Sequence, residues 1–315
     1  MNKVKIAISG IGAVGGYYGG LLARRYQNSE EVEIFFISRG ENLRVIREQG
    51  LQVKNTFQTM TAIPKLATDK PEEIGPVDYL FCCTKSYDLE DNIARLAPVI
   101  GPDTVIIPLL NGINITERIK KIVPHTEVWK GCVYIGARLT APGKVEKYTM
   151  KDRLFFGSST GDKKRQEELH TILSNARVLN TNPEDIDQEI WKKFFMISTA
   201  ATITSYFNES ISEVIDNHRD LFITLGFELQ SVAKALGVEL PEDIPFTSIE
   251  SQRIMPGYST TSMHDDYKKG KKTEIESLTG YVIEMAKAHR LEVPTYQFMY
   301  NGLTQFPYST HPQEK

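Results

Sequence analysis

The fold of this chain is decided by VKIAISGIGAVGGYYGG, the stretch of residues 4–20. Its first part, Val4–Ser9, is a short run rich in β-branched residues and is typical of a buried strand. This run leads into the pattern G-x-G-x-x-G at residues 10–15, and residues 16–25 have a helical pattern. A strand, this glycine pattern and a helix in direct succession predict a turn that binds the pyrophosphate of a dinucleotide.

Each glycine of the pattern has its own role in such a turn. Gly10 permits the tight turn, Gly12 lets backbone N–H groups approach the pyrophosphate, and Gly15 lets helix and strand pack closely. The beginning of the helix adds unpaired N–H groups and the positive end of its dipole. An ordinary glycine-rich turn is the weaker alternative, because the pattern directly follows a clear strand. We expect cofactor contacts at Gly10, Ile11, Gly12, Ala13, Val14 and Gly15.

The second predicted strand, Val32–Ile37, ends just before Arg39. At this place an NAD-binding fold carries Asp or Glu, which accepts a hydrogen bond from the ribose 2′-hydroxyl. Arg39 is instead a permanent cation whose planar guanidinium suits a phosphate. The sequence therefore predicts NADP(H) rather than NAD(H). A surface arginine that makes an ordinary ion pair is the alternative.

The first 181 residues alternate between strand-like and helix-like segments. The expected extended segments are Leu51–Lys54, Thr59–Ile63, Val77–Cys83, Thr104–Pro108, Val128–Thr140, Gly143–Tyr148, Arg153–Gly157 and Ala176–Leu179. Helices are expected at Glu41–Gln49 and Gln166–Asn175. Strands that alternate with helices predict an α/β fold with a doubly wound parallel sheet, which we place at residues 1–181.

Residues 182–315 form the second predicted domain, and their pattern is helical almost throughout. Turn and capping residues at Asn180–Asp185 mark the boundary. Helices are expected at Asp187–Tyr206, Ser212–Leu236 and Lys272–His289. The second domain is therefore predicted to be all-α.

Lys193 directly precedes the apolar run Phe194–Ile197, an unusual place for a lysine. On a helix it shares one face with Ile197 and Ala201, and Thr204 continues that face. If this face lines a crevice, desolvation disfavours the charged lysine and makes it a competent proton donor near neutral pH. A lysine that extends from a buried helix to the surface is the alternative.

A second group of polar residues lies at 258–266, YSTTSMHDD, followed by Glu274. Its hydroxyl groups suit the carboxylate of a substrate. Glu274 comes at the start of a helical pattern, where a carboxylate also serves as a capping group. Both a catalytic and a capping role stay open for Glu274.

The composition is that of a soluble globular chain, with 41% hydrophobic and 24% charged residues among 315. A net charge of −3 gives no electrostatic case for nucleic acid or a membrane surface, and no apolar run is long enough to span a membrane. We expect no signal peptide and a cytoplasmic location. Three cysteines without Cys-x-x-Cys spacing and six scattered histidines predict neither a disulfide framework nor a metal site.

The sequence resembles the ketopantoate reductase (2-dehydropantoate 2-reductase) family over essentially the whole chain. The residues that carry the resemblance, in the family's order, are Gly10–Gly15, Arg39, Thr84-Lys85, Asn111-Gly112, Trp191-Lys192-Lys193, Ser262–Asp266, Thr273–Glu276 and Ala288–Pro294. The resemblance implies an N-terminal Rossmann-like dinucleotide-binding domain. It also implies an all-α C-terminal domain of the kind found in 6-phosphogluconate dehydrogenase.

The resemblance further implies NADPH-dependent reduction of ketopantoate to pantoate, on the route to pantothenate and coenzyme A. Lys193 matches the general acid that protonates the carbonyl oxygen, and Glu274 matches the carboxylate that orients this lysine and the substrate hydroxyl. Ser262 matches a contact to the substrate carboxylate. Asn111 and Lys85 match crevice residues beside the cofactor.

Two helix positions depart from the family pattern. The family usually has asparagines four and eight residues after the lysine, where this chain has Ile197 and Ala201, and a third asparagine corresponds to Thr279. Nearby Ser198 and Thr202 are alternative hydrogen-bonding groups. We expect the substrate pocket at Lys193, Ile197, Ala201, Ser262 and Asn111.

Three functions therefore stay open. The first is ketopantoate reduction, and the second is reduction of a more apolar 2-oxo acid by a relative with an apolar pocket. The third is a non-catalytic NADPH-binding sensor, against which the presence of both Lys193 and Glu274 counts. The expected partner is a small 2-oxo acid substrate, and a homodimer is an open alternative to a monomer.

Overall fold

The computed structural model describes residues 3–150 and 152–305. The chain forms two compact units. The first comprises the residues up to Leu110 together with Asn114–Glu189, and the second comprises Asn111–Ile113 together with the residues from Ile190 onward. The sequence-based division after residue 181 stays a prediction.

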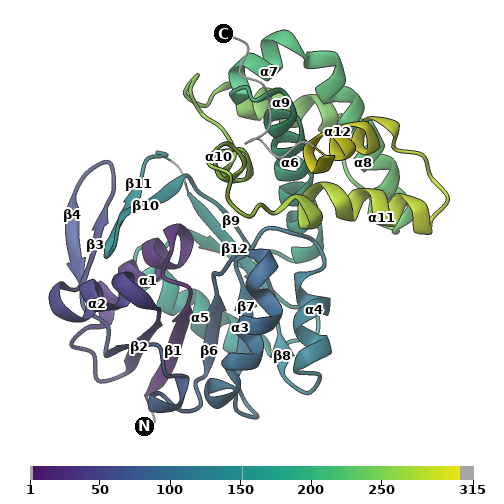
Figure 1. Ribbon diagram of the computed structural model, residues 1–315. Helices are drawn as coiled ribbons and strands as arrows, with labels where there is room; N and C mark the ends of the chain where they lie inside the picture. Colours follow the sequence, from purple (N-terminus) through teal and green to yellow (C-terminus); the bar gives the residue numbers. More distant parts are fainter. Residues whose placement is uncertain (1–2, 151, 306–315) are drawn as a thin grey trace. The chain divides into compact units, whose positions relative to one another are not determined.

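A six-stranded parallel sheet forms the centre of the first unit (Figure 1). Its strands in spatial order are β5 (Leu66–Thr68), β2 (Val32–Ile37), β1 (Val4–Ser9), β6 (Tyr79–Cys82), β7 (Val105–Pro108) and β8 (Glu127–Val128). The residues of β6 and β7 are buried throughout, as expected for a parallel sheet covered on both faces. The strand order reverses between β1 and β6, and in such sheets ligands bind beyond the carboxyl ends of the strands at this point.

The helices of the first unit are α1 (Ala13–Tyr26), α2 (Gly40–Gln49), α3 (Leu89–Arg95), α4 (Ile115–Ile122) and α5 (Lys163–Asn175). Short 3₁₀ turns lie at Pro71–Glu73, Ser86–Asp88 and Ala97–Val99. The predicted doubly wound α/β fold is confirmed, since parallel strands alternate with these helices along the chain.

Helix α1 packs between two sheets. The second is a four-stranded sheet in the order β10 (Ala137–Ala141), β11 (Lys144–Lys147), β3 (Leu51–Lys54) and β4 (Thr59–Ala62). A Cβ atom on Gly16 would lie 2.6 Å from Val145, and one on Gly20 would lie 2.4 Å from Val53, both in this second sheet. A Cβ atom on Gly19 would lie 3.1 Å from Phe36 of the main sheet. The glycines thus allow close packing on both sides of the helix.

A three-stranded sheet of β13 (Asn180–Thr181), β12 (Arg153–Gly157) and β9 (Lys130–Tyr134) completes the first unit. The expected closing strand at Ala176–Leu179 is wrong, because the closing strand is β13. Arg177 has φ +59°, a left-handed conformation that ends the turn after α5 and excludes an extended strand at this place.

The second unit is helical, as predicted. Its helices are α6 (Ile186–Phe207), which begins in the first unit, α7 (Ile211–Asn217), α8 (Arg219–Ala235), α9 (Ile244–Arg253), α10 (Ser262–Lys268), α11 (Tyr281–Ala288) and α12 (Pro294–Gln305). Two of the expected helices differ in the structure. The expected helix Ser212–Leu236 is divided, because the chain leaves helical geometry at His218, with φ −133° between α7 and α8. The expected helix Lys272–His289 begins only at Ile275, and its first part, Glu276–Gly280, is a π-helical segment that continues into α11. In the described residues, no helix is both long and apolar enough to cross a membrane.

Candidate functional site

The glycine turn has the geometry that its sequence predicts. Gly10 has φ +90°, and a Cβ atom there would lie 3.0 Å from the Cys83 carbonyl group. A Cβ atom on Gly15 would lie 2.2 Å from the carbonyl oxygen of Gly10, so any side chain is excluded while the backbone stays in place. At Gly12, by contrast, a Cβ atom would have no heavy atom within 4 Å. The turn is therefore closely packed at Gly10 and Gly15 and open at Gly12.

Helix α1 begins directly after this open point. Its N-cap is Gly12, which has no side chain to cap the first N–H groups, and its first turn carries no acidic residue. Unpaired N–H groups and the positive end of a 14-residue helix favour an anion at this place. The buried hydroxyl of Thr84, at the end of β6, also has no hydrogen-bond partner among the described residues. These residues fit the pyrophosphate of a dinucleotide.

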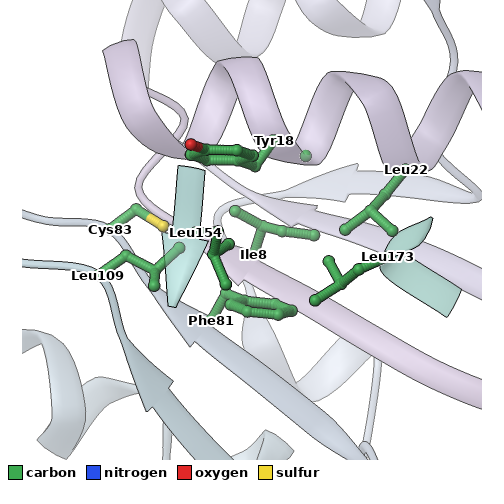
Figure 2. A pocket seen from close by; sticks show the side chains of 10 residues that line it. Ile8, Tyr18, Leu22, Phe81, Cys83, Leu109, Leu154 and Leu173 are labelled. Carbon is green, nitrogen blue, oxygen red and sulfur yellow. The ribbon is translucent and has the colours of Figure 1, made fainter. Parts of the chain in front are cut away.

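A small apolar cavity lies under α1 (Figure 2). Its volume is about 10 Å³, and residues of the sheet such as Ile8 and Phe81 line it together with Tyr18 of α1. A cavity of this size holds at most one water molecule. Burial raises the pKa of Tyr18 well above its ordinary value, so its hydroxyl stays protonated. The cavity is too small for a cofactor or substrate, and Gly15 of the glycine turn is among the residues that line it.

Arg39 is exposed at the end of β2, as the N-cap residue of α2. Within the described part of the chain, its guanidinium makes neither a hydrogen bond nor an ion pair. Arg44 on the same helix pairs with Glu41 at 2.5 Å and with Glu48 at 2.8 Å. Of the two arginines, Arg39 is thus the one available to an added phosphate. Lys85 is half-buried at the end of β6.

The predicted helix face that begins at Lys193 lies on α6 in the second unit. Lys193 and Ile197 are half-buried, and Ala201 is fully buried. Further along, the hydroxyl of Thr204 lies 3.2 Å from that of Thr261. The face thus leads from Lys193 toward the segment before Ser262, the exposed first residue of α10.

Glu274 is 3% exposed, and the amide Nδ2 of Asn111 donates a hydrogen bond to its Oε2 at 3.4 Å. Asn111 follows β7 in the chain, but it is grouped with the helical unit. A buried carboxylate needs hydrogen-bond donors, and Asn111 is one of them. The structure thus brings together two residues that the sequence assigned to the site from opposite parts of the chain.

Comparison with known proteins identifies the family. The family model "Ketopantoate reductase PanE/ApbA" matches residues 6–161, and "Ketopantoate reductase PanE/ApbA C terminal" matches residues 185–306. The chain belongs to the ketopantoate reductase family. Its predicted family and fold are confirmed, and it is an oxidoreductase of a family that uses a nicotinamide dinucleotide.

The proteins that this chain resembles do not all have the same named activity. A crystal structure of 2-dehydropantoate 2-reductase from Porphyromonas gingivalis W83 is 38% identical, with a TM-score of 0.85, covering 96% of this chain and 100% of that one. A ternary structure of D-mandelate dehydrogenase with NADH and anilino(oxo)acetate is 25% identical, with a TM-score of 0.83, covering 96% and 98%. The uncharacterized oxidoreductase YkpB from Bacillus subtilis is 26% identical, covering 96% of this chain and 99% of its own.

In this member of the ketopantoate reductase family, the hydroxyls of α6 next to Ile197 and Ala201 are engaged in other hydrogen bonds. The Ser198 hydroxyl donates to the carbonyl oxygen of Leu278 at 2.9 Å and lies 2.8 Å from the Tyr296 hydroxyl. Thr202 and Thr279 pair through their hydroxyls at 2.8 Å, and both side chains are fully buried. These hydroxyls hold α6 against the π-helical segment Glu276–Gly280, which begins two residues after Glu274.

His264 is a residue of the site region that sequence reasoning did not assign. It is 2% exposed, its Nδ1 lies 2.5 Å from the Thr260 hydroxyl, and its Nε2 lies 2.9 Å from Asn208 Oδ1. Burial, with a smaller effect of the Lys268 charge, lowers the pKa of His264 to about 4. A neutral imidazole that donates from Nε2 and accepts at Nδ1 satisfies both contacts. It holds the segment that carries Ser262 against the end of α6.

Proposed function

We propose that this protein reduces a 2-oxo acid with NADPH, and that ketopantoate, reduced to pantoate, is its substrate. The observation that supports this most is the hydrogen bond from Asn111 to the buried Glu274, in the unit that also holds Lys193. A sensor that only binds NADPH needs no buried carboxylate of this kind. The 38% identity to the P. gingivalis 2-dehydropantoate 2-reductase supports ketopantoate as the acid.

Each residue has a defined part in the proposed reaction. When bound, the nicotinamide supplies the hydride that attacks the carbonyl carbon. Lys193 Nζ gives the proton to the carbonyl oxygen, so that C=O becomes CH–OH, and Glu274 orients Lys193. The Ser262 hydroxyl donates to the substrate carboxylate.

The cofactor is held by other residues in this proposal. The N–H groups of the first turn of α1 bind the pyrophosphate, and Arg39 pairs with the 2′-phosphate. By the family resemblance, Asn111 and Lys85 would also contact the cofactor. A homodimer stays a further proposal, which sedimentation of the purified protein tests.

The test is NADPH oxidation with a panel of 2-oxo acids, for the wild type and for Lys193→Ala. Loss of a positioned proton donor lowers kcat about 10²- to 10⁴-fold, with little change in NADPH affinity. Lys192→Ala removes the neighbouring charge and serves as the control. No turnover of any 2-oxo acid by a wild-type protein that binds NADPH would contradict the proposal and favour the sensor.

A second candidate substrate is a more apolar 2-oxo acid. Ile197 and Ala201 offer no hydrogen bond, and the hydroxyls of Ser198 and Thr202 are engaged within the helical unit. A relative at 25% identity is a D-mandelate dehydrogenase solved with NADH and anilino(oxo)acetate.

The two substrate classes are distinguished by a matched pair of acids. Ketopantoate and 3,3-dimethyl-2-oxobutanoate differ by one hydroxyl group, so their ratio of kcat/KM measures how well the pocket binds that hydroxyl. A site that hydrogen-bonds this hydroxyl rejects the acid that lacks it by orders of magnitude. A preference for 3,3-dimethyl-2-oxobutanoate or phenylglyoxylate would favour the second candidate, and Ile197→Asn should then shift the ratio toward ketopantoate.

A further inference from the structure

The Asn42 side chain, on α2, joins three separate segments of the first unit. Its Nδ2 donates to the carbonyl oxygen of Ile11 at 2.8 Å and to the hydroxyl of Ser38 at 3.2 Å. Its Oδ1 accepts from the backbone N–H of Gly143 at 2.7 Å. One half-buried amide therefore uses both its donor and its acceptor groups, and the residues that it contacts are far from one another in the sequence.

The contact with Ile11 acts directly on the glycine turn. In a trans peptide the C=O of one residue and the N–H of the next point in opposite directions. Because Asn42 holds the Ile11 carbonyl, it also fixes the direction of the Gly12 N–H. Gly12 is the point where the turn is open, with no heavy atom within 4 Å of a Cβ atom built there.

The contact with Ser38 acts on the other end of the dinucleotide site. Ser38 is buried at the end of β2 and directly precedes Arg39. Its backbone N–H donates to the carbonyl oxygen of Thr68 in β5 at 3.0 Å, and its hydroxyl accepts from Asn42 of α2. Asn42 thus connects the turn for the pyrophosphate with the strand end that carries the cation for the 2′-phosphate.

The contact with Gly143 fixes Asn42 itself. Gly143 has φ +69° in the turn between β10 and β11, and its carbonyl accepts from Gln52 N–H at 2.8 Å. The Asn42 amide therefore accepts a hydrogen bond from the four-stranded sheet through Oδ1 and donates one to the glycine turn through Nδ2.

We propose that Asn42 is a positioning residue for the dinucleotide, which sets the direction of the Gly12 N–H and the place of Arg39. This inference rests on the proposed binding of NADPH. Through the Gly12 N–H, Asn42 contributes to the binding of the pyrophosphate, which NADPH and NADH share. Through Ser38, it sets the position of Arg39, which contacts the 2′-phosphate of NADPH alone.

The test uses Asn42→Leu, which keeps the approximate shape of the side chain and removes all three hydrogen bonds. Glu41→Gln is the matched control, since Glu41 is the exposed neighbour that pairs with Arg44. Kd values for NADPH and NADH are measured by fluorescence titration at a temperature where circular dichroism shows each variant folded. We expect both Kd values to rise about tenfold or more in Asn42→Leu, and KM for the 2-oxo acid at saturating NADPH to stay unchanged.

The outcomes separate this inference from the proposed function. A folded Asn42→Leu protein with the wild-type Kd for both cofactors would overturn the role of Asn42. If Asn42→Leu does not fold, Asn42→Ala, which places no carbon against the Ile11 carbonyl, is measured in the same way and decides the question. A wild-type protein that binds neither NADPH nor NADH would instead contradict the proposed function.

Discussion

Asn111 Nδ2 lies 3.4 Å from Glu274 Oε2, although 163 positions separate the two residues in the sequence. The contact gives a buried carboxylate a hydrogen-bond donor from the loop that follows β7. Because the helical unit contains Asn111 as well as Glu274, the contact is formed within one compact body. It is the structural basis for assigning both residues to one site.

Glu274→Gln should lower kcat about 10²- to 10³-fold, because the amide orients Lys193 less well than a carboxylate does. The Kd for NADPH should stay close to that of the wild type. Steady-state kinetics and a cofactor titration measure the two values. Glu276→Gln is the control, since Glu276 is exposed and accepts from the Tyr300 hydroxyl at 2.8 Å. Equal losses in both variants would contradict the assigned role.

Arg39→Ala should weaken NADPH much more than NADH. A charge-assisted hydrogen bond to a phosphate contributes about 1.5–3 kcal/mol, which corresponds to roughly a 10- to 150-fold change in Kd. Arg44→Ala removes a nearby cation that already pairs with Glu41 and Glu48, and should leave both cofactors unaffected. If Arg39→Ala weakened NADPH and NADH equally, Arg39 would not distinguish the phosphate.

Two glycines of the same turn should respond differently to alanine. Gly15→Ala places a methyl group 2.2 Å from the Gly10 carbonyl oxygen and 2.8 Å from Cys83 Cβ, so the backbone must move. Such overpacking costs about 1–3 kcal/mol or more and lowers Tm. Gly12→Ala meets no heavy atom within 4 Å, so Tm should stay close to the wild-type value while the Kd for NADPH rises. A large loss of Tm in Gly12→Ala would be evidence against an open turn.

His264 should make stability depend on pH. Burial, followed by the charge of Lys268, lowers its pKa from 6.5 to about 4. Between these values the unfolded chain binds a proton that the folded protein does not, so stability falls as the pH decreases from about 6.5 to about 4. Below pH 4 this residue adds no further loss.

Urea unfolding at a series of pH values measures this dependence. His264→Gln should show a smaller change in midpoint between pH 6.5 and 4 than the wild type, and the exposed His289→Gln should keep the wild-type change. An unchanged dependence in His264→Gln would show that other groups cause it.

Most of the fold could be predicted because its signals are local. Apolar runs such as Val4–Ser9 and the helical pattern at 187–206 each depend on neighbouring residues alone. The wrong element boundaries lie where a single residue has a backbone conformation that the sequence pattern does not reveal. Arg177 with φ +59° moved the closing strand to Asn180–Thr181, and His218 with φ −133° divided one expected helix into two.

The candidate site was predictable to a smaller extent. Gly10–Gly15 and Arg39 are recognisable by spacing, and Lys193 and Glu274 by resemblance, and their roles stay predictions. Asn42 was missed because nothing in its sequence neighbourhood marks it. Its three partners lie 4, 31 and 101 positions away, so only the folded chain brings them together.

By itself, the sequence determined a strand, a glycine turn and a helix, together with an arginine at the end of the next strand. These follow from steric limits on backbone angles and from side-chain periodicity, which act over a few residues. Only the tertiary structure decided that α1 packs between two sheets, that Asn111 reaches Glu274, and that Thr202 pairs with Thr279. Such contacts depend on how distant elements pack, because a buried polar group takes its partner from whichever segment lies against it.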